Sequence, residues 1–594
     1  MSATRILVCV AWPYASGDRH LGHVAGAYLP PDIFARYHRL AGHRVLMVSG
    51  SDTHGTPITV RAAQEGVTPA EIVARYHARF VQSFKDLGLS FDLFTHTDTQ
   101  NHWDVTHELF HNHLANGYIY RDRQQQPFCV IDGRFLADRY IEGTCPICGY
   151  ADARGDQCDN CGNTLDPIDL IRPRCKICGR SEIEIRETEH FFFDLAKASP
   201  YLAAWLNDGR KDHWRPAVIN YARQQAESGE LRGRAITRDI DWGINVPVPG
   251  WEHKVIYVWY DAVIGYFSAT REVCALMGNP EGWREWWLDP ATRSYYFIGK
   301  DNIPFHTIIW PAMLIGDGRG LNLPYDVPAN EYLNIEDRKI STSRRWTIDL
   351  PDFLSRYDPD PLRYVLTINA PETRDVNFTW DEFVRRNNDE LVATWGNLVN
   401  RTLGFAYSRF DARVPAPGPL DESDRALLAA SEAAFAEVGA ELEAVRLKLA
   451  LTKAMDLAHA ANRYLNEKAP WAQIKTDPTA AATTVYVTLQ VIDRLKVLLN
   501  PFLPFTTQRL HHFLGYDGDI FGRLYVDEVT DARGTRPVLR YDGSQIEARW
   551  EPTELRPGQP LRQPAPLYRK LDPEVVEAER QRLLARLGLS GDGG

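Results

Sequence analysis

Short apolar runs alternate with amphipathic stretches along the first hundred residues. The run "RILVCVAW" (5–12) predicts a strand, and residues 21–43, with apolar positions at helical spacing, predict a helix. A second apolar run, "RVLMVSGSD" (44–52), predicts the next strand and precedes a helix bounded by the capping residues Thr68 and Gly88. Strands that are apolar throughout and separated by helices are typical of a doubly wound parallel sheet, whose ligands bind beyond the carboxyl ends of the strands.

The rest of the chain departs from this alternation twice. It stops near residue 118 and resumes with residues 254–267 and 294–314, which predicts one sheet split by an insertion. Beyond about residue 386 the strand patterns disappear, and a long amphipathic pattern predicts an all-α bundle. The predicted units are the first half of the sheet domain (1–117), the insertion (118–235), the second half (236–325), a linker segment (326–385), the α-helical domain (386–540) and a C-terminal tail (541–594).

The cysteines gather in the predicted insertion. Two C-x₂-C pairs have the spacing of a four-thiolate zinc site: Cys145, Cys148, Cys158 and Cys161. A second, Cys₃Asp group could hold another zinc ion or remain empty: Cys129, Asp132, Cys175 and Cys178. Four protein ligands leave no open position on the metal, so we expect structural rather than catalytic zinc.

Composition narrows the class of protein. The 594 residues are 44% hydrophobic and 24% charged, as in ordinary globular proteins. The formal net charge of −11 argues against general coating of nucleic acid, but a structured RNA could still bind at local sites. No apolar run approaches the ~20 residues of a membrane span, and the N-terminus lacks a secretory signal pattern, so we expect a cytoplasmic protein with no membrane partner.

His20 and His23 follow the first strand and share one face of the next helix. They could bind a metal, pack in the core or contact a ligand, and no third metal ligand lies nearby in the sequence. A glycine-containing turn before a helix presents amide groups and a positive helix end, which suit phosphate. A polyphosphate needs more positive charge, and "DRKISTSRR" (337–345) supplies it, although "KISTS" alone is typical of a solvated loop.

Taken in this order, "HLGH" (20–23) and "KISTS" (339–343) resemble the HIGH and KMSKS signatures of class I aminoacyl-tRNA synthetases. Residues 5 to about 510 are similar to the methionyl-tRNA synthetase family, through the stretches "AWPYASGDRHLGH", "GSDTHGTPI", "YVWYDAVIGY", "FIGKDNIPFHTIIWPA", "NEYLNIEDRKISTS", "WGNLVNR" and "NEKAPW". The resemblance implies a Rossmann-like catalytic domain. It would form methionyl-adenylate from L-methionine and ATP, with Mg²⁺ accompanying ATP, and charge tRNA(Met), including the initiator tRNA.

The resemblance also implies roles for individual residues. Catalysis is assigned to His20, His23, Lys339 and Lys300. ATP binding is assigned to His20, Gly22, His23, Lys339, Ser341 and Ser343. Methionine binding is assigned to Ala11, Trp12 (through its backbone), Tyr14, Asp52, Trp259, Ala262, Tyr266, Asn302 and His306. Anticodon recognition is assigned to Asn397, Arg401 and Trp471.

This sequence departs from the family's pattern in the second signature. Ile340 stands in place of its methionine and Thr342 in place of its second lysine. Part of the phosphate-stabilising charge is therefore missing or is supplied by Arg338, Arg344 or Arg345. Each aromatic residue of the expected methionine pocket could instead be a packing residue, and so could Trp471.

Several alternatives stay open at this point. Other class I synthetases, for leucine, isoleucine, valine or cysteine, share the signatures; the first three carry a larger editing insertion, and the last places zinc in its amino-acid pocket. A non-catalytic RNA-binding paralogue is the alternative from another class. We expect a monomer, because no appended tRNA-binding barrel is evident past about residue 540, and we predict no role for residues 541–594.

Overall fold

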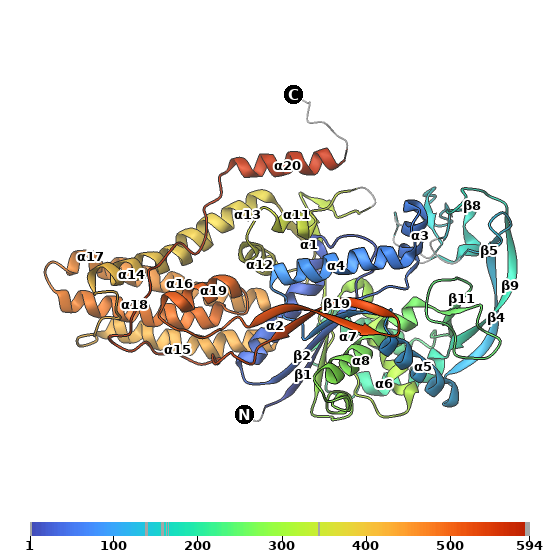
Figure 1. Ribbon diagram of the computed structural model, residues 1–594, viewed down its shortest axis with the longest axis horizontal. Helices are drawn as coiled ribbons and strands as arrows, with labels where there is room; N and C mark the ends of the chain where they lie inside the picture. Colours follow the sequence, from blue (N-terminus) through green and yellow to red (C-terminus); the bar gives the residue numbers. More distant parts are fainter. Residues whose placement is uncertain are drawn as a thin grey trace.

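A seven-stranded mixed sheet forms the centre of the protein (Figure 1). The computed structural model describes residues 3–136, 140–155, 158, 160–161, 163, 165–342 and 345–587. In spatial order the strands are β14 (Ala329–Asn330), β13 (Arg293–Gly299), β1 (Arg5–Val10), β2 (Arg44–Ser51), β3 (Leu93–His96), β19 (Gly534–Asp542) and β18 (Arg523–Asp531). The first five are parallel, and the chain reverses its direction of travel across the sheet at β1. Ligands of such sheets bind at this switch point.

Both faces of β1 are buried. Ile6, Val8 and Val10 face a cluster that includes α2 (Leu29–Leu40) and α4 (Pro69–Leu87). The alternate residues Leu7 and Cys9 face a second cluster with α5 (Gln100–Ala115) and α8 (Val258–Leu276). Helices on both faces explain why the strand is apolar along its length.

The helix predicted over residues 21–43 is divided. It consists of α1 (Leu21–His23), a π-helical turn, η1 (Val24–Tyr28), and α2. Pro30 has no amide hydrogen, so it cannot donate to the carbonyl of Gly26. That carbonyl instead accepts a hydrogen bond of 2.7 Å from the Asn330 side chain of β14. Through this hydrogen bond, η1, which directly follows the first signature, contacts β14 in the second half of the sheet.

The cysteine-rich segment forms sheets of its own, at the right of Figure 1. One sheet has the order β10 (Arg234–Ala235), β9 (Ile183–Phe193), β4 (Ile119–Cys129) and β5 (Arg134–Phe135), and another has β7 (Ala153–Arg154), β6 (Ile141–Thr144) and β8 (Ile171–Cys175). The elements that follow are α6 (Leu195–Leu206), α7 (Pro216–Glu227), β11 (Thr237–Arg238) and β12 (Val255–Ile256). These strands are separate from the central sheet.

A small module lies between the central sheet and the helical domain. Its three-stranded sheet has the order β16 (Arg338–Lys339), β15 (Leu333–Ile335) and β17 (Val376–Phe378). Its helices are α11 (Leu350–Leu354), α12 (Pro359–Ile368) and α13 (Trp380–Arg386). The remaining elements of the α/β part are α3 (Thr56–Glu65), α9 (Trp283–Trp287), η4 (Lys300–Asn302), η5 (Phe305–Ile309) and α10 (Trp310–Asp317).

The predicted helical domain is confirmed and lies at the left of Figure 1. It comprises η6 (Asn387–Gly396), α14 (Asn397–Arg409), α15 (Glu422–Glu443), α16 (Leu447–Lys468), α17 (Pro470–Gln473), α18 (Pro478–Leu499) and α19 (Pro504–Phe513). None of these helices, nor any other among the described residues, is long and apolar enough to cross a lipid bilayer.

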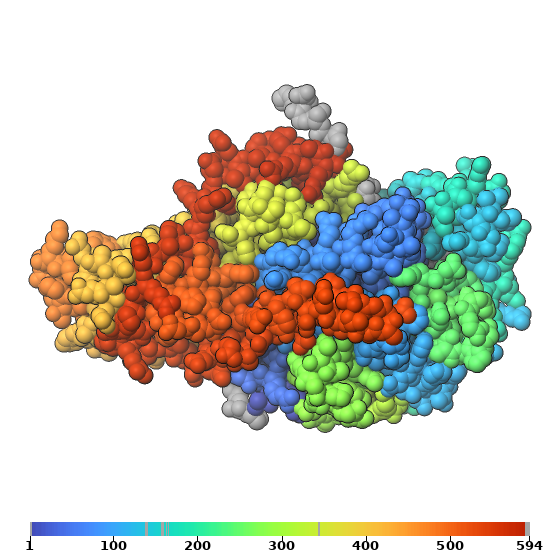
Figure 2. Space-filling model, in the orientation of Figure 1, coloured from blue at the N-terminus to red at the C-terminus, as the bar shows by residue number. Residues whose placement is uncertain are grey.

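The expectation that strands end near residue 386 is wrong. The hairpin β18–β19 returns to the central sheet, where Leu539 pairs with Phe94 in antiparallel register. Figure 2 shows this hairpin lying along the surface beside α4. The hairpin contains many charged residues, so its sequence does not show the apolar pattern of a buried strand. One of these residues, Arg536, is buried in an ion pair with Glu272. The central sheet is therefore mixed rather than wholly parallel.

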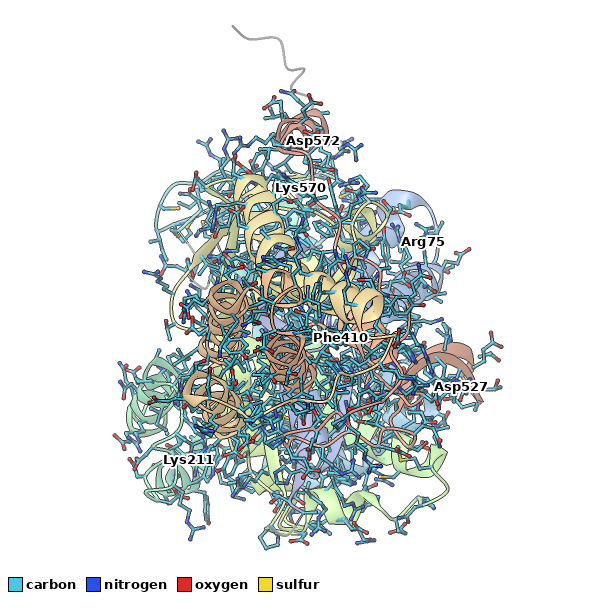
Figure 3. All side chains as sticks on the ribbon, turned by 90° about the vertical axis from the view of Figure 1, so that its left-hand side faces the viewer. Arg75, Lys211, Phe410, Asp527, Lys570 and Asp572 are labelled. Carbon is cyan, nitrogen blue, oxygen red and sulfur yellow. The ribbon has the colours of Figure 1, made fainter. Side chains whose placement is uncertain are left out.

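The tail contains a short charged helix, α20 (Glu574–Arg586). Figure 3 shows Lys570 and Asp572 where the chain approaches this helix, above the helical domain. The helix packs against α13. Residues 588–594 lie outside the described part of the chain.

Candidate active site

A cavity of about 600 Å³ opens at the switch point of the sheet. Its volume is that of a small-molecule site. Five residues of the two signatures line it: His20, Gly22, His23, Lys339 and Ile340. All the expected methionine-binding residues line it as well: Ala11, Trp12, Tyr14, Asp52, Trp259, Ala262, Tyr266, Asn302 and His306. The fold thus gathers into one cavity residues that are more than 300 positions apart in the sequence.

The two imidazoles at the cavity are stacked, with ring centroids 3.7 Å apart. The His20 backbone amide donates to Nδ1 of His23 over 3.3 Å, so the neutral His23 ring carries its proton on Nε2. Burial and the nearby Arg19 guanidinium lower the pKa of His20 to about 3, and burial, with His20 and Arg19, lowers the pKa of His23 well below its usual value. Both rings are therefore neutral hydrogen-bond donors at pH 7, and neither belongs to a metal-ligand group found among the described residues.

Arg19 holds the turn that presents these rings, and the sequence analysis missed it. Its guanidinium donates to the carbonyls of Tyr14 and Gly17 over 3.2 and 2.6 Å and lies 4.7 Å from the centroid of Phe80. On the other side, the Leu350 amide donates to the Arg19 carbonyl over 2.7 Å. An arginine directly before the first histidine was the only signal available in the sequence.

The two signatures touch at Gly22. A Cβ atom at this position would stand 2.7 Å from Cδ1 of Ile340 and 3.1 Å from Nδ1 of His20. A side chain at this position would therefore displace the Ile340 side chain and crowd the His20 ring. The Lys339 side chain lines the cavity and is exposed, so its ammonium group can reach a ligand there.

Not every described residue of the second signature lines the cavity. Ser341 forms a backbone pair with Trp346 and does not line the cavity, and Ser343 and Arg344 lie outside the described residues. Arg338 lies 4.9 Å from the centroid of Trp346. The role expected of Ser341 in ATP binding therefore stays a prediction without support from its position.

Lys300 is also absent from the cavity lining. Its ammonium group lies 2.6 Å from a carboxylate oxygen of Glu331 and 2.8 Å from one of Asp375. Partial burial would lower its pKa, but hydrogen bonds to these two carboxylates outweigh burial and raise it. The structure places Lys300 in an ion-pair network beside the cavity, and its expected catalytic role stays a prediction.

The aromatic wall of the cavity depends on two glycines. A Cβ atom at Gly265 would stand 2.5 Å from Cε2 of Trp12, and one at Gly50 would stand 2.2 Å from Cζ3 of the same ring. The two glycines form a slot that fixes the indole. Trp12 then contacts Tyr266 edge-on, with ring centroids 6.4 Å apart.

A hydrogen-bonded pair adjoins this wall. The Tyr266 hydroxyl lies 2.7 Å from Nε2 of His306, and Nδ1 of His306 lies 2.9 Å from the Asn302 carbonyl. The carbonyl can only accept, so Nδ1 carries the proton and Nε2 accepts from Tyr266. Burial lowers the pKa of His306 to about 4, which keeps this arrangement neutral at pH 7.

Asp52 places a buried carboxyl group at the cavity. The Ala15 amide donates to the Asp52 carbonyl over 3.0 Å, because the segments that follow β1 and β2 run side by side. The Asp52 side chain is buried, and burial, with the Asp261 carboxylate nearby, raises its pKa well above the usual value. A cationic ligand group in the cavity would stabilise the ionised form of Asp52 and so lower its pKa.

A buried network lies behind Asp52, and the sequence analysis missed it. Nδ1 of His54 lies 2.6 Å from Oδ2 of Asp261, whose other oxygen contacts Nε2 of His102. Against the effect of burial, Asp261 and Asp98 raise the pKa of His54 to about 10, while the two imidazoles lower the pKa of Asp261 to about 2. His54 is therefore protonated at neutral pH. "SDTHG" contains His54, but nothing in the sequence indicated that Asp261 would lie beside it.

The two cysteine groups are assembled as predicted. In each group the four candidate ligand atoms lie within 4.8 Å of one another. The sulfur atoms of Cys145 and Cys161 are 4.0 Å apart, those of Cys148 and Cys158 are 3.6 Å apart, and the cysteines are free. Ligands ~2.3 Å from a tetrahedral zinc ion would be ~3.8 Å apart, whereas a disulfide would bring them to ~2.0 Å. These residues fit zinc.

The second group has the same geometry. The sulfur atoms of Cys129 and Cys178 are 3.6 Å apart, and Sγ of Cys175 lies 3.0 Å from Oδ2 of Asp132. Three thiols and one carboxylate converge on one point, as a Cys₃Asp zinc site requires.

Two of the three expected anticodon residues lie together at the far end of the helical domain. The Arg401 guanidinium of α14 lies 4.6 Å from the ring centroid of Trp471 in α17, and it donates to Oδ1 of Asn466 over 3.1 Å. Trp471 is 41% exposed, which excludes the core-packing alternative for this residue. Asn397 is exposed at the first turn of α14.

Comparisons with known proteins agree with this geometry. The family model "tRNA synthetases class I (M)" matches residues 6–403, and "Anticodon binding domain of methionyl tRNA ligase" matches residues 414–531. The methionine–tRNA ligase of Thermomicrobium roseum is 58% identical over 98% of this chain and 99% of its own length. That of Thermobifida fusca is 49% identical over 99% of this chain and 100% of its own length.

Solved structures give the same result. Mycobacterium tuberculosis methionyl-tRNA synthetase in complex with methionyl-adenylate superposes with a TM-score of 0.75 at 26% identity, covering 96% of this chain and 100% of that one. Its apo form gives a TM-score of 0.67 at 25% identity, covering 96% and 99%. A cavity that joins both signatures to an aromatic pocket, together with near full-length relatives, shows that the chain belongs to the methionyl-tRNA synthetase family of class I aminoacyl-tRNA synthetases.

Proposed function

We propose that the chain activates L-methionine with ATP and transfers the methionyl group to tRNA(Met), including the initiator tRNA. One observation carries the proposal: a single cavity is lined by the stacked imidazoles and Lys339 and also by an aromatic pocket with the buried Asp52. The relatives named methionine–tRNA ligase and the M. tuberculosis enzyme in complex with methionyl-adenylate support this substrate pair.

The chemistry requires positioning more than proton transfer. A carboxylate oxygen of methionine attacks the α-phosphorus of ATP, the bond from this phosphorus to the bridging oxygen breaks, and pyrophosphate leaves with the electron pair. The carboxylate is already a competent nucleophile, so no general base is needed. Catalysis then consists of aligning the two groups and stabilising negative charge on the phosphates.

The signature residues supply that stabilisation. Nε2 of His23 and the ring of His20 donate hydrogen bonds to the phosphates as neutral groups, in keeping with their lowered pKa values. Lys339 adds the full positive charge on the opposite side, next to the departing pyrophosphate. Part of the phosphate charge would be shielded by the Mg²⁺ that accompanies ATP.

The aromatic pocket binds methionine. The Asp52 carboxylate pairs with the substrate ammonium group, which restores the charge balance that burial disturbs. Trp12, Trp259 and Tyr266 surround the thioether, whose polarizable sulfur gains ~0.3–1.5 kcal/mol from each aromatic contact. Leucine and isoleucine lack this gain, so the pocket favours methionine.

Residues outside the cavity serve RNA recognition and stability. Arg401 and Trp471, with Asn397, contact the unstacked bases of the anticodon by hydrogen bonding and stacking. Both cysteine groups would hold structural zinc ions that stabilise residues 118–235 as a connective insertion in the catalytic domain. The protein acts as a monomer.

The proposal is tested by amino-acid-dependent exchange of pyrophosphate into ATP. Methionine should support exchange, while leucine, isoleucine, valine and cysteine should support it poorly. A second assay should show charging of both elongator and initiator tRNA(Met). Exchange that depends equally on leucine, or tRNA binding without any exchange, would favour one of the alternatives given above.

A further inference from the structure

The turn that leads into Lys339 has an unfavourable backbone. β15 and β16 form a hairpin in which Ile335 pairs with Arg338, so Glu336 and Asp337 form a two-residue turn. Both have positive φ, 45° and 61°. Such turns favour Asn-Gly, because glycine has no Cβ and asparagine adopts positive φ more readily than most residues. A turn of this kind persists where surrounding contacts hold it.

Part of that support comes from the far end of the chain. The Glu336 carboxylate accepts a hydrogen bond of 2.8 Å from the Trp380 amide and one of 3.0 Å from Nε of Arg580 in α20. Arg580 also contacts the Asp381 carboxylate. Asp337 is held locally, since its amide donates to the Asn377 side chain over 3.0 Å.

The same helix reaches the other end of the loop. The Arg586 guanidinium donates to the Thr347 carbonyl over 2.9 Å and lies 3.0 and 3.1 Å from carboxylate oxygens of Asp349 and Asp352. Asp349 forms a backbone bridge with His20. Arg586 thus holds the segment on which the first signature is docked.

One face of α20 makes these contacts. Glu579, Leu583 and Arg586 follow helical spacing, and Glu579 and Leu583 are only 4% exposed. The Glu579 carboxylate accepts hydrogen bonds from Arg356 over 2.7 Å and from the Tyr357 hydroxyl over 2.8 Å. These bonds fix the helix on the module that carries β15 and β16, as Figure 1 shows for α20 above α13 and α11.

We propose that α20 positions the segment that carries Lys339. Arg580 holds one end of this segment and Arg586 holds the other. Through these contacts the tail sets the distance between Lys339 and the imidazole pair. Arg580 and Arg586 are therefore positioning residues, because they touch the loop and not the substrate. The proposal rests on the proposed role of Lys339 in stabilising the phosphates of ATP.

The test uses the full-length chain with Arg580→Ala and Arg586→Ala combined. Its kcat for pyrophosphate exchange should fall severalfold, because each partly exposed ion pair that is lost accounts for up to about fivefold. The KM for ATP should rise, while the KM for methionine should stay unchanged, because no methionine-pocket residue contacts α20 in the interactions described above. A merely structural role would change both KM values together or neither.

Two further variants serve as controls. Arg582 lies on the same helix, is 56% exposed and lies 3.5 Å from Glu579, so Arg582→Ala should behave nearly as wild type. Arg580→Lys with Arg586→Lys retains both charges and should recover most of the lost activity. If the alanine variant folds poorly, this lysine variant and the thermal midpoint of each protein separate misfolding from misplacement of the loop.

Amide hydrogen exchange of residues 333–342 tests, without an activity assay, whether α20 holds the segment that carries Lys339. It should quicken in the double alanine variant and not in Arg582→Ala. Unchanged amide hydrogen exchange in the double alanine variant would overturn the proposal. Faster hydrogen exchange together with an unchanged kcat and an unchanged KM for ATP would overturn it as well. If the Lys339→Ala variant instead keeps wild-type activity, the proposed role of Lys339 is wrong. The hydrogen-exchange result would still show whether α20 holds the segment that carries Lys339.

Discussion

A methyl group added at Gly265 should damage methionine binding without weakening the helix that carries it. Gly265 lies within α8, where alanine is favoured over glycine by ~1 kcal/mol. The new Cβ would stand 2.5 Å from Cε2 and 2.7 Å from Cζ2 of Trp12, about 1 Å closer than ordinary carbon contacts of ~3.5–4.0 Å. The indole must therefore shift toward the cavity.

The size of the effect follows from these distances. Overpacking a well-filled site costs ~1–3 kcal/mol, which the gain in helix propensity offsets in part. The net change in the free energy of unfolding should stay within ~2 kcal/mol. Inside the pocket, an intrusion of one methylene changes specificity by ~10–200-fold. The KM for methionine should therefore rise at least tenfold, while the KM for ATP stays unchanged.

The matched control is Gly404→Ala. Gly404 lies in α14, also inside a helix, and a Cβ there would meet nothing within 4 Å. This variant should be slightly more stable than wild type and should show unchanged exchange kinetics. Pyrophosphate-exchange kinetics at varied methionine, together with thermal melting, provide both readouts. A Gly265→Ala enzyme with the wild-type KM for methionine would refute the claim that Gly50 and Gly265 fix the position of the Trp12 ring.

Four further predictions follow from single sites. Trp471→Ala should raise the KM for tRNA and leave pyrophosphate exchange intact; a loss of exchange would make the residue structural. Asp52→Asn should raise the KM for methionine and not that for ATP, as steady-state exchange will report. Cys148→Ser should lower bound zinc, measured by elemental analysis, from two equivalents per chain to one; one equivalent in wild type would rule out the second site. The folded pKa of His54, about 10, exceeds its unfolded value near 6.5, so its contribution to stability is complete below pH 6.5 and is lost as the pH rises toward 10; His54→Gln should flatten urea-derived stability over this range, and an unchanged slope would contradict the ion pair with Asp261.

The parts of the fold that local pattern determines could be predicted from the sequence. β1 and β2 are apolar because both faces are covered, and Thr68 caps the start of α4 as predicted. The cysteine pairs carry their ligand spacing within a few residues, so both groups were found. The two signatures were found because glycine, histidine and lysine stand at fixed places in short motifs.

The parts set by distant contacts could not be predicted. The hairpin β18–β19 is rich in charge, and only its pairing with Phe94 and the burial of Arg536 against Glu272 make it part of the sheet. The network of His54, Asp261 and His102 joins three segments that no local pattern connects. The contacts of α20 likewise depend on carboxylates more than 190 residues earlier in the chain.

The central claim is that ATP lies between the imidazole pair and Lys339. The most direct measurement is methionine-dependent pyrophosphate exchange for His23→Ala and Lys339→Ala, with methionine affinity measured separately by tryptophan fluorescence. We predict that each substitution lowers kcat by ~10²–10³-fold, the cost of losing one charge-stabilising donor, and leaves methionine affinity unchanged. Exchange at the wild-type rate, or an equal loss of methionine affinity, would contradict the account.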